Sequence, residues 1–239
     1  MEGIFKRVNI IFSIALVITM LLSLLSYISR TTETIDATGQ EQVKRLKIVI
    51  DPGHGGIDQG ASGDLNIEEA PINLAISEKL MCFLEGSGFD VEMTRYADEG
   101  LYSLKSKTIR EKKNEDLKNR VELINESEAD LVVSIHLNSF PQKQYYGAHV
   151  FYQKSNPSGK IAADILQDSL KNILDKTNKR VPQIKSNIKI MDETTVPVLL
   201  IECGFLSNSA EEKKLISDDY QEKTAWAIYA GLMKYFNEF

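Results

Sequence analysis

The sequence alternates short, continuous apolar runs with longer segments of helical periodicity, and this alternation restricts the fold more than any other feature. The apolar runs predict strands at 46–50, 89–93, 131–137, 148–152 and 196–201. Consecutive apolar residues are typical of strands that are covered on both faces of a parallel sheet. The expected helices lie between them, at 71–85, 115–127, 159–176 and 219–236. The sequence therefore predicts an α/β domain with a mostly parallel twisted sheet and helices on both faces.

Length and composition indicate one globular domain with a short additional segment. The chain has 239 residues, of which 43% are hydrophobic and 26% charged. The formal net charge of −6 argues against a nucleic-acid partner, because binding phosphates requires an excess of clustered Lys and Arg. Cys82 and Cys203 lack the spacing of a metal-binding or redox pair, and we expect both to be buried. A bridge between them stays open outside the cytosol.

The N-terminal segment predicts where the chain works. Lys6 and Arg7 precede an apolar stretch at 10–28 that contains no charge. A stretch of roughly 19 residues is long enough to cross a bilayer as a helix. Residues 1–30 are therefore expected to form a transmembrane anchor or, alternatively, a cleaved signal helix. Residues 31–45 read as a polar linker, 46–239 as the folded domain, and we expect that domain to lie outside the cytoplasm.

Polar side chains stand where three of the expected strands end. His54 follows the first strand in a loop with five glycines, His136 ends the strand at 131–137, and Glu202 follows the strand at 196–201. Ligands of open parallel sheets bind outside the carboxyl ends of the strands. We therefore expect these three residues to meet at one edge of the sheet.

Two histidines and one carboxylate, with a fourth position open, form a typical catalytic zinc site. The carboxylate can come from Glu69 or from its neighbour Glu68, both at the end of the glycine-rich loop. Spacing alone does not distinguish Glu202 from a fourth ligand. Single histidines at strand ends are more often simply exposed, so only the combination points to a metal. His149 lies within an expected strand, away from this edge, and is assigned no role.

Four ordered motifs carry a resemblance to a known family. They are IVIDPGHGG at 48–56, Glu69 four residues before Asn73, SIHLN at 134–138 and PVLLIECGFLSN at 197–208. Together they resemble the zinc-dependent N-acetylmuramoyl-L-alanine amidases over the whole domain. The N-terminal anchor and the lack of wall-binding repeats are similar to the germination-specific spore-cortex amidases.

The resemblance implies a role for each candidate residue. His54, Glu69 and His136 would bind Zn²⁺, Glu202 would act as the catalytic acid and base, and Arg120 and Asn138 would support the site. The substrate would be peptidoglycan, and the bond that between N-acetylmuramic acid and L-alanine. A spore-cortex enzyme would work in the forespore intermembrane space, in muramic-lactam formation. An accessory lipoprotein partner is a further expectation.

Two alternatives stay open at this point. A zinc peptidase that cuts within the stem peptide would use a similar metal site on an α/β sheet. The second alternative is a catalytically silent protein that has the same fold and binds the cell wall but hydrolyses no bond. The mass of the digestion products separates the first alternative from an amidase, and the absence of both metal and product would favour the second.

Overall fold

The computed structural model describes residues 18–23 and 45–238, and the compact domain begins at Arg45. The predicted anchor at 1–30 and linker at 31–45 therefore lie almost wholly outside the described residues. Residues 18–23 are helical and exposed. Within the described ranges, no helix combines the length and the apolar character that crossing a membrane requires.

The domain is built on one six-stranded sheet with the order β2-β1-β3-β6-β4-β5. Its strands are β1 (Lys47–Pro52), β2 (Asp90–Met93), β3 (Leu131–Asn138), β4 (His149–Tyr152), β5 (Gln183–Ile184) and β6 (Val198–Phe205). β1, β2, β3 and β6 run parallel, whereas β4 pairs antiparallel with β6. The prediction of a mostly parallel sheet is confirmed, and the reversal of β4 is the feature it lacked.

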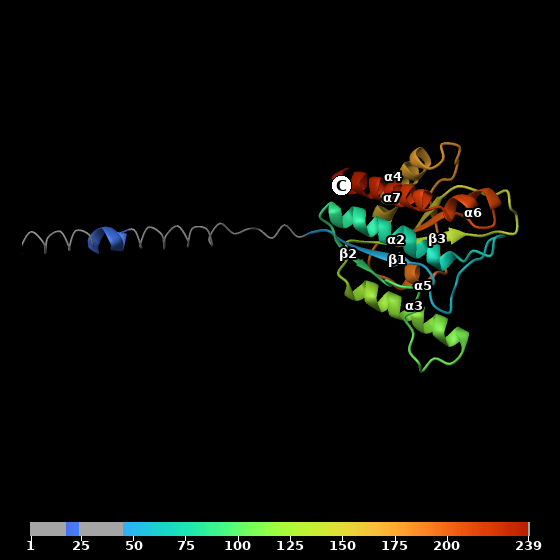
Figure 1. Ribbon diagram of the computed structural model, residues 1–239, viewed down its shortest axis with the longest axis horizontal. Coiled ribbons are helices and arrows are strands. Elements are labelled where there is room, and N and C mark those ends of the chain that lie inside the picture. Colours follow the sequence, from blue (N-terminus) through green and yellow to red (C-terminus); the bar gives the residue numbers. More distant parts are fainter. Residues whose placement is uncertain (1–17, 24–44, 239) are drawn as a thin grey trace, which may run out of the picture. The chain divides into compact units, whose positions relative to one another are not determined.

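Helices cover both faces of the sheet, as predicted. The helices of the domain are α2 (Glu69–Gly86), α3 (Ile109–Glu126), α4 (Pro157–Ile173), α5 (Lys189–Glu193), α6 (Ser209–Leu215) and α7 (Asp218–Glu238). α2, α4 and α7 pack over one face, and α3 and α5 over the other (Figure 1). Each face has its own apolar core, and β1 shows why: Ile48 and Ile50 enter one core while Val49, between them, enters the other.

The start of α2 decides the position of a candidate ligand. Glu69 is the first helical residue, and Pro71 stands in the first turn, where its missing N–H costs no hydrogen bond. Ile72, Ile76 and Leu80 bury one side of the helix against the sheet. This packing fixes the helix axis, so the first turn holds Glu69 at the edge of the sheet where the parallel strands end.

Candidate metal centre

The structure brings three of the predicted residues together at the carboxyl end of the sheet. His54 comes from the loop after β1, Glu69 from the first turn of α2, and His136 from β3. One ligand atom from each lies within 4.8 Å of the others. Glu68 is exposed and takes no part, whereas Glu69 is 2% exposed. The geometry therefore selects Glu69 over its neighbour.

The carboxylate of Glu69 lies between the two imidazoles. Its Oε2 is 3.3 Å from His54 Nε2, and its Oε1 is 3.1 Å from His136 Nδ1. The backbone N–H groups of Ala61 and Leu137 each donate to it at 2.9 Å. Burial alone would raise the pKa of Glu69, but the hydrogen bonds from His136 and His54 outweigh burial and hold it well below its usual range. Glu69 is thus a fixed negative charge facing two nitrogen ligands.

The backbone around His54 is shaped for this convergence. His54 has a φ of 64°, in the left-handed region that non-glycine residues rarely occupy. A Cβ at Gly60 would lie 2.6 Å from Glu69 Oε2, and a Cβ at Gly53 would collide with the imidazole of His136. Glycine is therefore required at both positions for the ligands to come this close.

Two buried arginines donate hydrogen bonds to the backbone of the loop that carries His54. Arg120 donates to the carbonyl oxygens of Pro52 at 2.9 Å and His54 at 2.7 Å, and it pairs with the buried carboxylate of Asp51 at 2.7 Å. Arg95 donates to the carbonyl oxygens of Pro52 and Gly53, both at 3.0 Å. Arg120 thus contacts the backbone of the His54 loop. Its contacts are those of a residue that positions the loop.

Asp58 is a site residue that the sequence analysis missed. Its Oδ2 lies 3.0 Å from His54 Nδ1, and Lys113 pairs with its other oxygen at 2.8 Å. A carboxylate on the far nitrogen fixes the imidazole so that Nε2 is the nitrogen that faces Glu69. Burial would lower the pKa of His54, but the hydrogen bonds to Asp58 and Glu69 raise it to about 9. The spacing of four residues after His54 was the available signal.

Glu202 lies beside this group, directly opposite His136 in the pairing of β3 with β6. It is 7% exposed, and its Oε1 accepts a hydrogen bond from Lys185 Nζ at 2.8 Å. Its Oε2 is buried and has no hydrogen-bond partner in the described part of the chain. A buried oxygen without a donor is a natural acceptor for a proton from water or substrate.

Lys185 is the second site residue that the sequence analysis missed, and its ammonium group packs on an aromatic ring. Its Nζ lies 4.4 Å from the centre of the Phe151 ring, which in turn contacts the ring of His149 at 4.1 Å between centroids. His149 pairs with Glu202 across β4 and β6. The expectation that His149 lies away from the strand ends was wrong, because the antiparallel course of β4 brings its first residue to the edge where β6 ends.

Two other predictions need correction. Asn138 ends β3, but its side chain accepts only the N–H of its neighbour Ser139. In the described structure it makes no hydrogen bond to the candidate ligands or to Glu202. Cys203 is buried as expected, whereas Cys82 is exposed, and the two are not bridged. Cys82 lies on the solvent-exposed side of α2, opposite the side that packs against the sheet.

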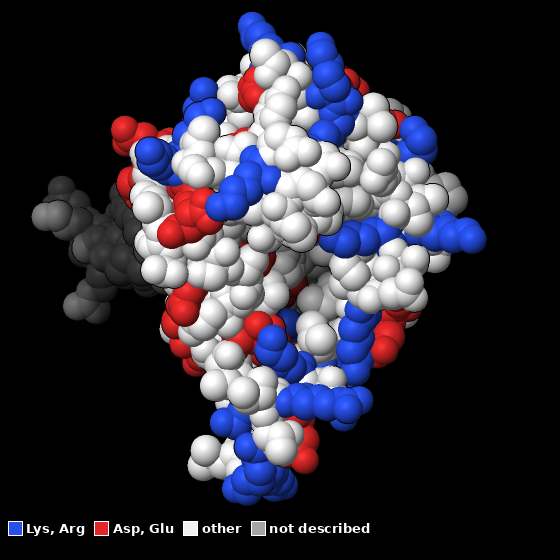
Figure 2. Space-filling view, turned by 90° about the vertical axis from the view of Figure 1, so that its right-hand side faces the viewer, with Lys and Arg blue, Asp and Glu red and all other residues white. Residues whose placement is uncertain are grey.

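The residues present fit a zinc ion. Two imidazole nitrogens and one carboxylate oxygen match the ligand set of catalytic zinc, which leaves one position for water or substrate. Glu202 pairs with His136 in the sheet, and its buried Oε2 has no donor in the described residues, so it can accept a proton from a group in that position. Figure 2 views the side of the molecule where the parallel strands end and shows basic side chains around a hollow with acidic side chains inside it.

A family comparison agrees with this geometry. Residues 48–234 match the model of a family described as N-acetylmuramoyl-L-alanine amidase. The chain belongs to this family. It is therefore an N-acetylmuramoyl-L-alanine amidase, an enzyme that acts on peptidoglycan.

Individual members of the family are similar to the chain over most of its length. The germination-specific N-acetylmuramoyl-L-alanine amidase of Bacillus subtilis is 40% identical over 191 residues, which cover 80% of each protein. The CwlD amidase of Clostridioides difficile, solved in complex with the GerS lipoprotein, is 46% identical with a TM-score of 0.80, over 82% of this chain and all of that one. A second Clostridium difficile amidase structure is 30% identical with a TM-score of 0.71, over 81% of this chain and 97% of that one.

Proposed function

We propose that the enzyme is a zinc amidase in which His54, Glu69 and His136 bind the metal and Glu202 moves the proton. The observation that carries this proposal is the group of two imidazoles and one buried carboxylate, together with a Glu202 Oε2 that no described residue hydrogen-bonds. A bound zinc ion lowers the pKa of water from ~15.7 to around 7 and polarises a carbonyl group. The remaining chemistry falls to the protein's own side chains.

Glu202 acts at the amide bond between the lactyl group of N-acetylmuramic acid and L-alanine. Its Oε2 accepts a proton from the attacking water as the oxygen–carbon bond forms. The same oxygen then gives that proton to the amine nitrogen as the carbon–nitrogen bond breaks, as general acid–base catalysis requires. The products are a free lactyl carboxylate on the glycan and a free amine on the stem peptide.

Replacing Glu202 with Ala tests the assignment. We expect turnover of peptidoglycan to fall by at least about 10²-fold, because the proton transfer is lost, while bound zinc measured by metal analysis persists. Glu122→Ala, a change at an exposed glutamate of α3, is the matched control and should keep activity. Full activity of the Glu202→Ala variant would contradict the proposal.

The bond that is cut has its own test. Mass spectrometry of digested peptidoglycan should find glycan strands from which L-alanine has been removed. Fragments that retain L-alanine on the glycan would instead indicate a peptidase acting within the stem peptide. This measurement is independent of which residue carries the proton.

The relatives suggest a biological setting, which we add to the proposal. The Bacillus subtilis relative is named germination-specific, so we propose action on spore-cortex peptidoglycan outside the cytoplasm, with residues 1–30 directing the domain there. Removal of the peptide would be the step that permits a muramic lactam to form. Spores of a strain carrying Glu202→Ala should then contain cortex without muramic lactam.

The Clostridioides difficile relative was solved with a lipoprotein, and we propose that this enzyme has a similar accessory partner. Zinc retention by the purified chain should then rise when the partner is present. Equal zinc retention with and without a lipoprotein that co-purifies with the chain would contradict a role of the partner at the metal site.

A further inference from the structure

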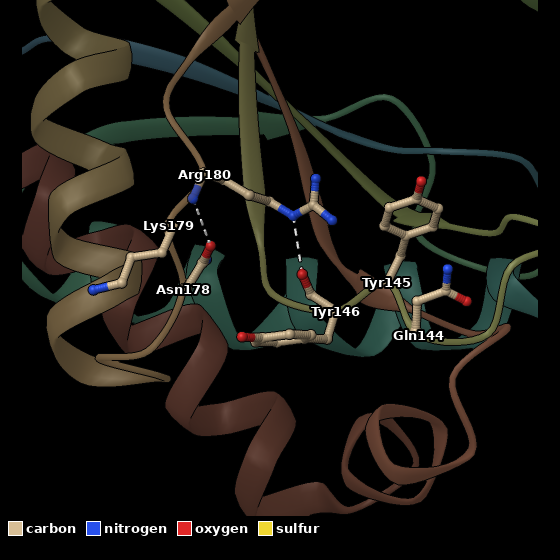
Figure 3. Close-up of a pocket in the computed structure, with 6 residues that line it drawn as sticks. All are labelled: Gln144, Tyr145, Tyr146, Asn178, Lys179 and Arg180. Carbon is tan, nitrogen blue, oxygen red and sulfur yellow. Dashed lines mark hydrogen bonds between the residues drawn. The ribbon is translucent and has the colours of Figure 1, made fainter.

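A second pocket is lined by none of the residues of the proposed centre. It has a volume of about 320 Å³ and is lined by Gln144, Tyr145, Tyr146, Asn178, Lys179 and Arg180 (Figure 3). The lining comes from the segment before β4 and the segment between α4 and β5. A volume at the lower end of the range for ligand sites suits a fragment of a larger substrate.

Among the described residues, the Arg180 side chain uses one of its five N–H donors. Its Nε donates to the carbonyl oxygen of Tyr146 at 2.9 Å, and its guanidinium lies 4.6 Å from the centre of the Phe205 ring. Among the described residues, its two terminal nitrogens have no hydrogen-bond or ion-pair partner, and Figure 3 shows them directed past Tyr145. Two parallel free donors on a fixed plane match the two oxygens of a carboxylate.

The buried carboxylate of Glu211 attracts this guanidinium electrostatically but makes no hydrogen bond or ion pair with it in the described part of the chain. Glu211 accepts the backbone N–H groups of Gly147 and Phe205, at 3.0 and 2.9 Å. Its contacts therefore lie with the backbone around the pocket and leave the terminal nitrogens of Arg180 available. An outside anion can take a position that no described residue fills.

The pocket is tied to the neighbourhood of Glu202. Asn178 donates to the carbonyl oxygen of Ala148 at 2.8 Å, and the His149 ring lies 2.8 Å from the carbonyl oxygen of Val181. His149 is the residue opposite Glu202 in the sheet. Only two residues separate Tyr146 from His149, so the Cα atoms of these two residues lie within about 11 Å of each other. A short extended peptide can reach from one place to the other.

The segment that forms this side of the pocket is basic, although the chain as a whole is acidic. Residues 176–191 contain five cations and no Asp or Glu, in a chain of net charge −6. They are Lys176, Lys179, Arg180, Lys185 and Lys189. Lys185 and Lys189 pair with Glu202 and Glu193. The remaining cations, Lys176, Lys179 and Arg180, still favour an anionic ligand over a neutral sugar or an apolar side chain.

We propose that Arg180 binds a carboxylate of the stem peptide through its two terminal nitrogens and so selects substrates whose peptide carries a free carboxyl group. The inference rests on the amidase activity of the family and adds a subsite on the peptide side of the cut bond. Tyr145 and Tyr146 line the pocket and limit its width. An amide in place of the carboxylate would present one N–H group to the guanidinium and lose one hydrogen bond and the charge.

The test compares two soluble muropeptides that differ only in whether their peptide carboxyl groups are free or converted to carboxamides. We expect the metal-loaded full chain to cleave the free form with about 10-fold higher kcat/KM, mainly through KM. Arg180→Met should lose this preference, because only cleavage of the free form should become slower. Arg180→Lys should keep part of the preference, because lysine has the positive charge but not the two parallel N–H donors of the guanidinium. Arg110→Met, at an exposed arginine of α3, is the matched control.

A binding measurement keeps the test independent of turnover and of the variant's folding. Calorimetric titration of the unaltered chain with the released stem peptide should show binding that weakens about 10-fold when the carboxyl groups are amidated. Equal affinity for the two peptides, or equal kcat/KM for the two muropeptides, would overturn the subsite. Failure to cleave either muropeptide while the peptides still bind differently would instead count against the proposed zinc chemistry.

Discussion

The ammonium group of Lys185 lies 2.8 Å from one carboxylate oxygen of Glu202, and the other oxygen has no hydrogen-bond partner among the residues that the structure describes. This arrangement fixes the carboxylate in one orientation. It also makes Lys185 a positioning residue that acts through Glu202.

Lys185→Met should lower kcat about 10-fold, since it removes a charge-assisted hydrogen bond while keeping a chain of similar length over Phe151. KM and zinc content should not change, because neither depends on the orientation of Glu202. Lys185→Arg should recover most of the rate. Lys79→Met, which breaks a surface pair with Asp218, is the control, and a change in KM alone would refute the positioning role.

Asp58→Asn should weaken zinc binding about 10- to 100-fold, because Asp58 fixes the far nitrogen of the His54 ring. Competition with a chelator of known affinity measures this directly. Asp64→Asn is the matched control in the same loop, since Asp64 is exposed and pairs with Lys143. Equal affinities of the two variants would show that Asp58 does not orient the ligand.

Arg120→Met should lower the free energy of unfolding by about 3–5 kcal/mol. The substitution leaves the carboxylate of Asp51 buried without its cation and frees the carbonyl oxygen of His54. Urea denaturation followed by circular dichroism gives the value. Lys118→Met on the exposed side of the same helix should change it by less than about 0.5 kcal/mol, so similar losses in both variants would argue against this account.

His149 should make the domain less stable in mild acid. Burial, chiefly, holds the pKa of His149 below its usual range, with the positive charges of Arg180 and Lys185 acting in the same direction and Glu202 opposing them. The unfolded chain therefore binds more protons than the folded one below about pH 6.5. His149→Gln should reduce the loss of unfolding free energy between pH 7.5 and 5.5. An unchanged pH dependence would contradict this assignment.

The sequence predicted most of the sheet and the central residues because both leave local signals. Continuous apolar runs marked β1, β3 and β6, and the polar residues that follow or end them marked the edge where His54, His136 and Glu202 meet. The first third of α3, residues 109–114, was missed, although Thr108 and Glu111 form a capping box that marks the start of the helix. The charged segment that surrounds this signal has no apolar period.

Other features depend on contacts that no local pattern encodes. The direction of β4 is set by its pairing with β6, and this pairing moves His149 from one end of the sheet to the other. β5 consists of two residues, both exposed, so no apolar run marks it in the sequence. Lys185 reaches Glu202 only because β5 joins the sheet beside β4, so its role could not be read from spacing.

The hydrogen bonds from Arg95 and Arg120 to the His54 loop require no metal. The strained backbone of His54 is therefore stabilised by the folding of the domain, and binding of the ion does not have to supply that energy. We therefore expect folding and metal loading to be separate equilibria. We expect the chain to fold before it is active, to lose and regain zinc without unfolding, and to have its activity set by the supply of zinc where it works.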